Sequence, residues 1–204
     1  MPSHRGIAGP VAHRAVAHRA VALGAVALGA LMLSACSYTE AATPKSDHYL
    51  ATQPDSGPSG GEIEDGLNVA DTHMPALARL DSALLAALQM AAADARLSGV
   101  DVHVTSGWRS AAYQQRLFDE AVAKYGSVDE ASKWVHSPSL SKHVSGQAVD
   151  IGPTDADDWL IQHGSDYGLC QTYANEMWHF ELATTPGGEC PPQRNNPSDE
   201  RAEG

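Results

Sequence analysis

Two short segments of the chain combine residue types that can bind a metal ion and activate water. The first, SKHVSGQAVD, covers residues 141–150, and the second, EMWH, covers residues 176–179. Two histidines and one carboxylate suit a catalytic zinc ion and leave one coordination position open for water. The segments therefore predict a zinc hydrolase in which His143, Asp150 and His179 bind the metal. Glu176 is then the carboxylate that could accept a proton from the water and return it to a leaving amine.

Alternating side chains indicate that the two segments bring their metal ligands to a common face. Residues 147–151 are predicted to form a strand with an apolar face on one side and Asp150 on the other. Residues 178–182 are predicted to form a second strand, in which His179 lies opposite an apolar face formed by Trp178, Phe180 and Leu182. Two such strands side by side would bury a core beneath Asp150 and His179. A Ser-Gly turn would let His143 approach the same point.

A third segment, SGWRS at residues 106–110, contributes a permanent positive charge. Arg109 could stabilise a developing oxyanion or hold a substrate carboxylate through paired N–H donors. An ordinary ion-pair partner is the alternative interpretation of this arginine. Glu181, on the same strand face as His179, is expected to support that histidine or to be solvated rather than to bind the metal.

The surrounding periodicity predicts a single α+β domain. Apolar spacing predicts one long helix from Pro75 to near Gly99, and further helices at residues 110–124, 127–135 and 155–163. Strands are expected at residues 100–105, 147–151, 167–170 and 178–182. Because helices come first and antiparallel strands dominate the second half, the sequence predicts a small antiparallel sheet packed with helices.

The N-terminus has the composition of a secretory signal peptide. Three arginines and no acidic residue precede a short apolar run at residues 20–33. The segment LSAC at residues 33–36 resembles the lipobox of bacterial lipoproteins, whose cysteine is acylated, so Cys36 is the expected lipidation site. An ordinary cleaved signal peptide is the alternative. The lipobox implies a protein anchored by lipid to the outer face of the cytoplasmic membrane.

Composition divides the chain into four parts. We expect a signal peptide at residues 1–35, a lipid-attached flexible linker at residues 36–68, the zinc domain at residues 69–190 and a disordered tail at residues 191–204. If Cys36 carries lipid, Cys170 and Cys190 remain as a pair, and an exported protein can form that disulfide.

Charge excludes one class of partner. Cleavage before Cys36 removes three of the 13 basic residues and none of the 25 acidic residues, which leaves a formal charge of −15. Such a surface repels nucleic acid and anionic lipid headgroups. We expect no nucleic-acid partner, and we expect the protein to be a monomer.

Taken together, the three motifs resemble the VanY-type D-alanyl-D-alanine carboxypeptidases of the zinc DD-peptidase group. The resemblance covers roughly residues 70–185 and implies the Hedgehog/DD-peptidase fold and a bound Zn2+ ion. It implies that Glu176 is the catalytic base, that Arg109 stabilises the transition state, and that the metal ligands are His143, Asp150 and His179. Gln114 matches a substrate-contacting glutamine of these enzymes, and Ser141, which opens the first motif, is also assigned to substrate binding.

The chain departs from this family pattern at two positions. Met177 stands where the family usually has proline, and Trp108 stands where it usually has tyrosine. Neither change removes a reactive group. The loop that holds Glu176 lacks this proline. We therefore expect the departure to affect the rate of the reaction more than the chemistry of the reaction.

The implied reaction is hydrolysis of the terminal D-Ala-D-Ala bond of peptidoglycan stem peptides by a zinc-activated water, with Glu176 as general base. One alternative is a VanX-like dipeptidase, which would act on free D-Ala-D-Ala in the cytoplasm. The export signal, and the lack of an evident extra acid for the substrate amine, favour the carboxypeptidase. The other alternative, a non-catalytic zinc-binding or peptidoglycan-binding module, would have no need of Glu176.

Overall fold

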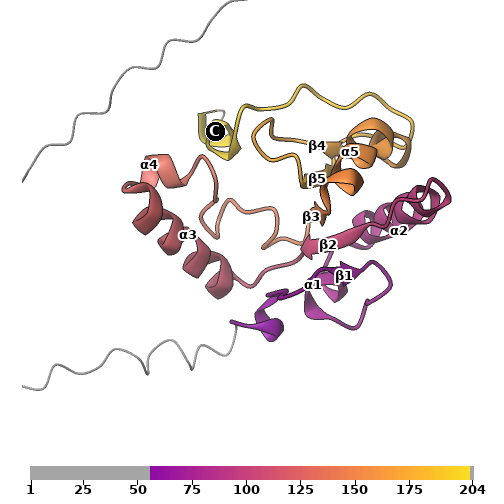
Figure 1. Ribbon diagram of the computed structural model, residues 1–204. Coiled ribbons are helices and arrows are strands. Elements are labelled where there is room, and N and C mark those ends of the chain that lie inside the picture. Colours follow the sequence, from indigo (N-terminus) through magenta and orange to yellow (C-terminus); the bar gives the residue numbers. More distant parts are fainter. Residues whose placement is uncertain (1–55, 203–204) are drawn as a thin grey trace, which may run out of the picture. The chain divides into compact units, whose positions relative to one another are not determined.

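The computed structural model describes residues 56–202 (Figure 1). The expected signal peptide, Cys36 and most of the expected linker lie outside these residues. Within the described range, none of the helices has both the length and the apolar character needed to cross a membrane.

A five-stranded antiparallel sheet in the order β1-β2-β3-β5-β4 forms the centre of the domain. Its strands are Leu67–Asn68, His103–Ser106, Ala148–Gly152, Leu169–Gln171 and His179–Leu182, numbered β1 to β5 along the chain. All five residues of the central strand β3 are buried. In the β3–β5 pair, Asp150 lies directly opposite His179, which confirms the predicted common face.

The sheet has one face for the core and one face for polar chemistry. The helices are α1 (Pro75–Ala78), α2 (Ser82–Leu97), α3 (Ala111–Tyr125), α4 (Val128–Ala131) and α5 (Thr154–His163). One continuous core joins α2 and α5 to the apolar face of β3 and β5, through residues that include Leu88, Leu160, Val149 and Phe180. In Figure 1, α2 and α5 lie on one side of the strands, and α3 and α4 lie on the other. The α+β prediction is confirmed.

The single long helix predicted from Pro75 to Gly99 is wrong, because the structure divides it into α1 and α2. The side chain of Asp81 caps α2 by accepting hydrogen bonds from the backbone N–H groups of Ala83 and Leu84. The backbone N–H of Asp81 in turn donates to the carbonyl of Gly146. A side chain on Gly146 would collide with the backbone of Arg79. The helix break is therefore where the loop that follows His143 packs.

Two residues predicted on the apolar face of the last strand are instead partly exposed. Trp178 and Leu182 expose 40% and 37% of their surface, whereas Phe180 between them is fully buried. Leu182 is the last residue of β5 and Trp178 precedes its first residue, so neither lies fully over the core. Trp178 lines a cleft beside the polar face.

The folded unit extends beyond the predicted boundaries at both ends. Near the N-terminus, the carbonyl of Gly60 accepts a hydrogen bond from the backbone of Ser110, and Glu62 pairs with Arg116 at 2.9 Å. At the other end, part of the segment predicted as a tail contacts the domain, where the backbone of Arg194 pairs with that of Thr172 and Ala174. The carbonyl of Pro197 lies 2.7 Å from Nε2 of His136. These contacts are polar, so hydrophobic periodicity gave no signal for them.

Cys170 and Cys190 form a disulfide, as predicted. The bond joins β4 to the segment after β5, and the 20-residue separation between the two cysteines includes both Glu176 and His179. The crosslink therefore closes the loop that carries two of the candidate functional residues.

Removing this crosslink tests whether it supports the site. A Cys170→Ala, Cys190→Ala double variant is expected to lose about 3 kcal/mol in its free energy of unfolding, because the unfolded chain gains loop entropy. We also expect lower peptidase activity, since the closed loop carries Glu176. Denaturant titration and an activity assay, with the oxidised wild type as reference, give the two values. Unchanged activity would show that the bridge does not position the loop.

Candidate active site

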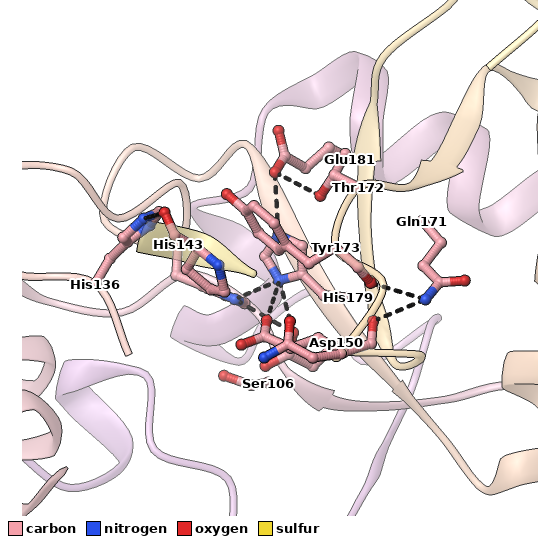
Figure 2. A network of polar contacts seen from close by, with 12 residues as sticks. Ser106, His136, His143, Asp150, Gln171, Thr172, Tyr173, His179 and Glu181 are labelled. Atoms are coloured by element: carbon pink, nitrogen blue, oxygen red, sulfur yellow. Dashed lines mark hydrogen bonds and ion pairs between the residues drawn. The ribbon is translucent and has the colours of Figure 1, made fainter. Parts of the chain in front are cut away.

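The structure brings His143, Asp150 and His179 together in one buried cluster on the polar side of the sheet (Figure 2). One candidate ligand atom from each residue lies within 4.8 Å of the other two. Nδ1 of His179 is 3.1 Å from Oδ1 of Asp150, and Nε2 of His143 is 3.3 Å from the same oxygen. Nε2 of His143 is also 3.3 Å from Nδ1 of His179. Two ring nitrogens and a carboxylate oxygen thus converge on one point.

The outer nitrogen of each imidazole has a partner that sets the ring orientation. Nδ1 of His143 donates to the carbonyl oxygen of Gly107 at 2.8 Å, so Nε2 carries the lone pair and faces Asp150. Nε2 of His179 donates to Glu181 at 3.1 Å, and Glu181 also accepts from Thr172 at 3.0 Å (Figure 2). Metal-binding histidines commonly have such a carbonyl or carboxylate partner behind them. Glu181 thus supports His179, as the sequence predicted.

Burial and neighbouring charges shift the pKa of each of the three residues. Burial, followed by the charge of Arg109, lowers the pKa of His143, which keeps this imidazole neutral. Burial raises the pKa of Asp150, but the neighbouring histidines and Arg109 outweigh it and hold the pKa well below its usual range. Burial lowers the pKa of His179, but hydrogen bonds and charges from Asp150 and Glu181 outweigh it and raise the pKa to about 9. A metal ion would therefore compete with a proton at Nδ1 of His179.

Glu176 lies at the edge of this cluster. Its Oε2 is 3.9 Å from Nδ1 of His179, the nitrogen that faces Asp150. Burial and then the charge of Asp150 raise the pKa of Glu176 to about 7, although His179 and Arg109 act in the opposite direction. A carboxyl group with a pKa near neutrality can both accept and donate a proton at physiological pH.

Backbone hydrogen bonds fix the loop of Glu176 even though Met177 replaces the usual proline. The N–H of Glu176 donates to the carbonyl of Tyr173, and the N–H of His179 donates to the carbonyl of Glu176, both at 3.2 Å. The side chain of Gln171 donates to the carbonyl of Tyr173 at 2.8 Å (Figure 2). The loop is therefore held by several contacts that do not depend on residue 177.

Arg109 reaches the cluster from the turn that follows β2. Its Nη2 donates to Oδ2 of Asp150 at 2.8 Å, its Nε to Ser106 at 2.7 Å and its Nη1 to Gln114 at 3.1 Å. The backbone N–H of Arg109 also donates to the carbonyl of His143. The guanidinium group is therefore fixed on three sides. Sequence reasoning missed Ser106, although its place in the SGWRS motif was a signal.

The two residues predicted to contact substrate lie in different surroundings. Gln114 exposes only 1% of its surface, and its amide group contacts Arg109 and the carbonyl of His136. Ser141 is buried and lines a separate hollow of about 450 Å³ formed by residues between 138 and 147. Direct contact of either residue with substrate stays a prediction, whereas the contact between Gln114 and Arg109 is a feature of the structure.

An open cleft of about 500 Å³ lies next to Arg109 and Asp150. Tyr113 and Trp178 line it, together with Asp157 from the first turns of α5. The sequence showed no evident extra acid for a substrate amine, whereas the structure places Asp157 in this cleft. The sequence did not single out Asp157, because it is one of three acids near the start of a predicted helix, Asp155, Asp157 and Asp158. A stabilising interaction with the helix dipole was a sufficient explanation for all three.

Comparison with known proteins gives a consistent set of relatives. A family model described as VanY, D-alanyl-D-alanine carboxypeptidase, matches residues 77–185. A D-alanyl-D-alanine carboxypeptidase of Enterococcus faecalis (strain ATCC 700802 / V583) is 32% identical over 111 residues, which cover 42% of this chain. The match spans 41% of the length of that relative.

Two solved structures are also similar to this chain. One is a mutant of the vancomycin resistance D,D-pentapeptidase VanY from a VanB-type resistance cassette, in complex with Zn(II). It is 28% identical, with a TM-score of 0.48, and the match covers 53% of this chain and 73% of that one. The other is VanYB in complex with D-Alanine-D-Alanine. It is 29% identical, with a TM-score of 0.48, and the match covers 50% of this chain and 70% of that one.

Proposed function

We propose that this chain, which belongs to the VanY family of D-alanyl-D-alanine carboxypeptidases, is a zinc-dependent enzyme. It would release the terminal D-alanine from peptidoglycan stem peptides. The observation that carries the proposal is the buried cluster of His143, Asp150 and His179, whose ligand atoms converge while Gly107 and Glu181 orient the two rings. Glu176 beside this cluster supports a catalytic role over mere metal binding.

The donor set fits a zinc ion. His143, Asp150 and His179 would hold it through two nitrogens and one oxygen, which leaves a position for water or substrate. When bound in such a site, zinc acts as a Lewis acid and makes water nucleophilic at neutral pH. Magnesium and calcium prefer all-oxygen ligand sets, so the two imidazoles favour zinc over either ion.

Glu176 and Arg109 would carry out the remaining chemistry. Glu176 would take the proton of the attacking water and pass it to the nitrogen of the departing D-alanine. Arg109, held by Ser106, Gln114 and Asp150, would place a fixed positive charge where the oxygen of the scissile carbonyl becomes negative. Because three contacts orient the guanidinium in advance, little reorganisation is needed during the reaction.

Arg109→Lys is expected to lower kcat for D-alanine release by about 10²- to 10³-fold, the usual cost of losing one oxyanion donor. Lysine keeps the charge but lacks the planar fork that contacts three partners at once. Steady-state kinetics with zinc-loaded protein measures the change. Arg116→Lys is the matched control, since Arg116 pairs with Glu62 away from the cluster. Equal kcat values for the two variants would contradict a role for Arg109 in the transition state.

The proposed reaction can be tested directly. Purified protein is analysed for bound metal and then assayed for release of D-alanine from a stem pentapeptide and from free D-Ala-D-Ala. We expect zinc in the protein and faster release from the pentapeptide. Faster cleavage of the free dipeptide would favour the dipeptidase alternative, to which the acid Asp157 gives some support. Bound zinc with no turnover of either substrate would favour a non-catalytic module.

We also propose that Cys36 carries a lipid that holds the enzyme at the outer face of the cytoplasmic membrane. The lipobox-like segment at residues 33–36 supports this placement. Mass spectrometry of the mature N-terminus tests it, and an unmodified terminus downstream of Cys36 would contradict it.

A further inference from the structure

Asp157 is a buried carboxylate that the proposed chemistry does not use. It lies in α5, exposes only 5% of its surface, and its Oδ1 has no hydrogen-bond partner among the residues that the structure describes. Within that same range, no lysine, arginine or histidine forms an ion pair with it. A buried carboxylate is costly unless a cation or hydrogen-bond donors compensate it. Asp157 therefore lacks the partner that its burial calls for.

The helix dipole does not explain this arrangement. Asp155, two residues earlier in the same helix, is exposed, and its side chain accepts a hydrogen bond from the backbone N–H of Ala156. An acid that only stabilises the start of a helix needs no more than such a position. Asp157 is instead buried and lines the cleft.

The position of Asp157 connects it to the reaction site. It lines the same cleft of about 500 Å³ as Arg109 and Asp150. Burial, followed by the charges of Asp158, Asp150 and Asp155, raises the pKa of Asp157 to about 6. The three charged groups that raise this pKa are all carboxylates. This part of the cleft attracts a cation, and a carboxylate that lacks a protein partner can be neutralised by a bound ligand.

We infer that Asp157 binds a primary ammonium group of the peptide substrate and thereby selects ammonium-bearing peptides over neutral ones. The inference rests on the proposed carboxypeptidase function, because it assigns a specificity determinant to the same site. Two parts of a substrate could supply the ammonium. One is the α-amine of a free dipeptide, and the other is the side chain of a basic residue that precedes the D-Ala-D-Ala pair.

Two matched substrate pairs separate these sources. The first pair is D-Ala-D-Ala and its N-acetyl derivative. The second is Nα-acetyl-L-Lys-D-Ala-D-Ala and the same peptide with its ε-amine also acetylated. In the wild type, kcat/KM is expected to be about 10- to 100-fold higher for the ammonium-bearing member of one pair, which is the usual range for a hydrogen bond to a charged group. The pair that shows the preference identifies the source of the ammonium.

Asp157→Asn is expected to reduce this preference to less than threefold, because asparagine keeps the shape of the side chain and loses its charge. Asp166→Asn is the matched control, since Asp166 is an exposed acid that does not line the cleft, and it should keep the wild-type preference. A merely structural effect of Asp157→Asn would lower both members of a pair equally. No preference in the wild type, or an unchanged preference in Asp157→Asn, would overturn the inference.

A binding experiment keeps the inference separate from the proposed function. If zinc-loaded wild type hydrolyses none of the four peptides, the proposed function fails. The affinities of the same peptides are then measured by calorimetry with the Glu176→Ala variant, with and without Asp157→Asn. Tighter binding of an ammonium-bearing peptide that disappears with Asp157→Asn supports the inference. Equal affinities within both pairs overturn it.

Discussion

Glu176→Ala is expected to lower kcat for D-alanine release by about 10²- to 10⁴-fold, which is the usual contribution of a positioned general acid or base. Alanine removes the carboxylate whose Oε2 lies 3.9 Å from Nδ1 of His179, the nitrogen that faces Asp150. The three candidate metal ligands remain, so the variant should still contain as much zinc as the wild type. Single-turnover kinetics and metal analysis of the same preparation measure the two properties.

Two comparisons make this result specific. Glu176→Gln keeps the shape of the side chain but cannot accept the proton, so it should be about as inactive as Glu176→Ala. Glu130→Gln replaces an exposed glutamate that pairs with Lys133, and it should behave as the wild type. If Glu176→Ala retained full turnover, the general base would have to be another group. If it lost its zinc, Glu176 would contribute to metal binding.

His179→Ala is expected to lose both zinc and turnover. The variant removes one of three converging ligand atoms and leaves Asp150 and Glu181 without their shared histidine partner. Loss of a group that only supports a ligand typically weakens metal binding by about 10- to 100-fold. Loss of the ligand itself should therefore weaken it further. Zinc retained after dialysis against a competing chelator, followed by an activity assay, measures the effect.

The matched variants for this prediction lie behind the ligand and far from it. Glu181→Gln should weaken zinc binding by only about 10- to 100-fold, because Nε2 of His179 can still donate to the amide oxygen. His73→Ala replaces an exposed histidine and should leave zinc binding unchanged. If Glu181→Gln were as severe as His179→Ala, the cluster would depend on Glu181 as a ligand and not as a support. If His179→Ala kept its zinc, the assigned ligand set would be wrong.

The strand pair that carries the site was predictable from sequence for a geometric reason. Successive side chains of a strand point to opposite faces, so the pattern around Asp150 and His179 fixes which side of each strand faces the core. The structure pairs these two residues across β3 and β5. The disulfide was predictable as well, once Cys36 was assigned to lipid, because only Cys170 and Cys190 remained.

Other parts of the site depend on contacts between residues far apart in sequence. The break between α1 and α2 follows from the packing of Asp81 against Gly146, while local apolar spacing favours one helix through both. The three contacts that fix Arg109 come from β2, α3 and β3. Only Asp150 is distant from Arg109 in sequence, but the burial of Gln114 also depends on the packing of the chain, which local patterns do not report.

By itself, the sequence determined the candidate ligand types, the shared face of Asp150 and His179, and the family to which the chain belongs. The tertiary structure alone decided how the two imidazoles are oriented, since Gly107 and Glu181 are their outer partners. It also decided which acid at the start of α5 lines the cleft. The sequence does not distinguish Asp155, Asp157 and Asp158, but the packing of α5 beside β3 buries only Asp157 at the cleft. Burial is a property of the packed chain, and it gives a carboxylate a need for a partner that its sequence position cannot reveal.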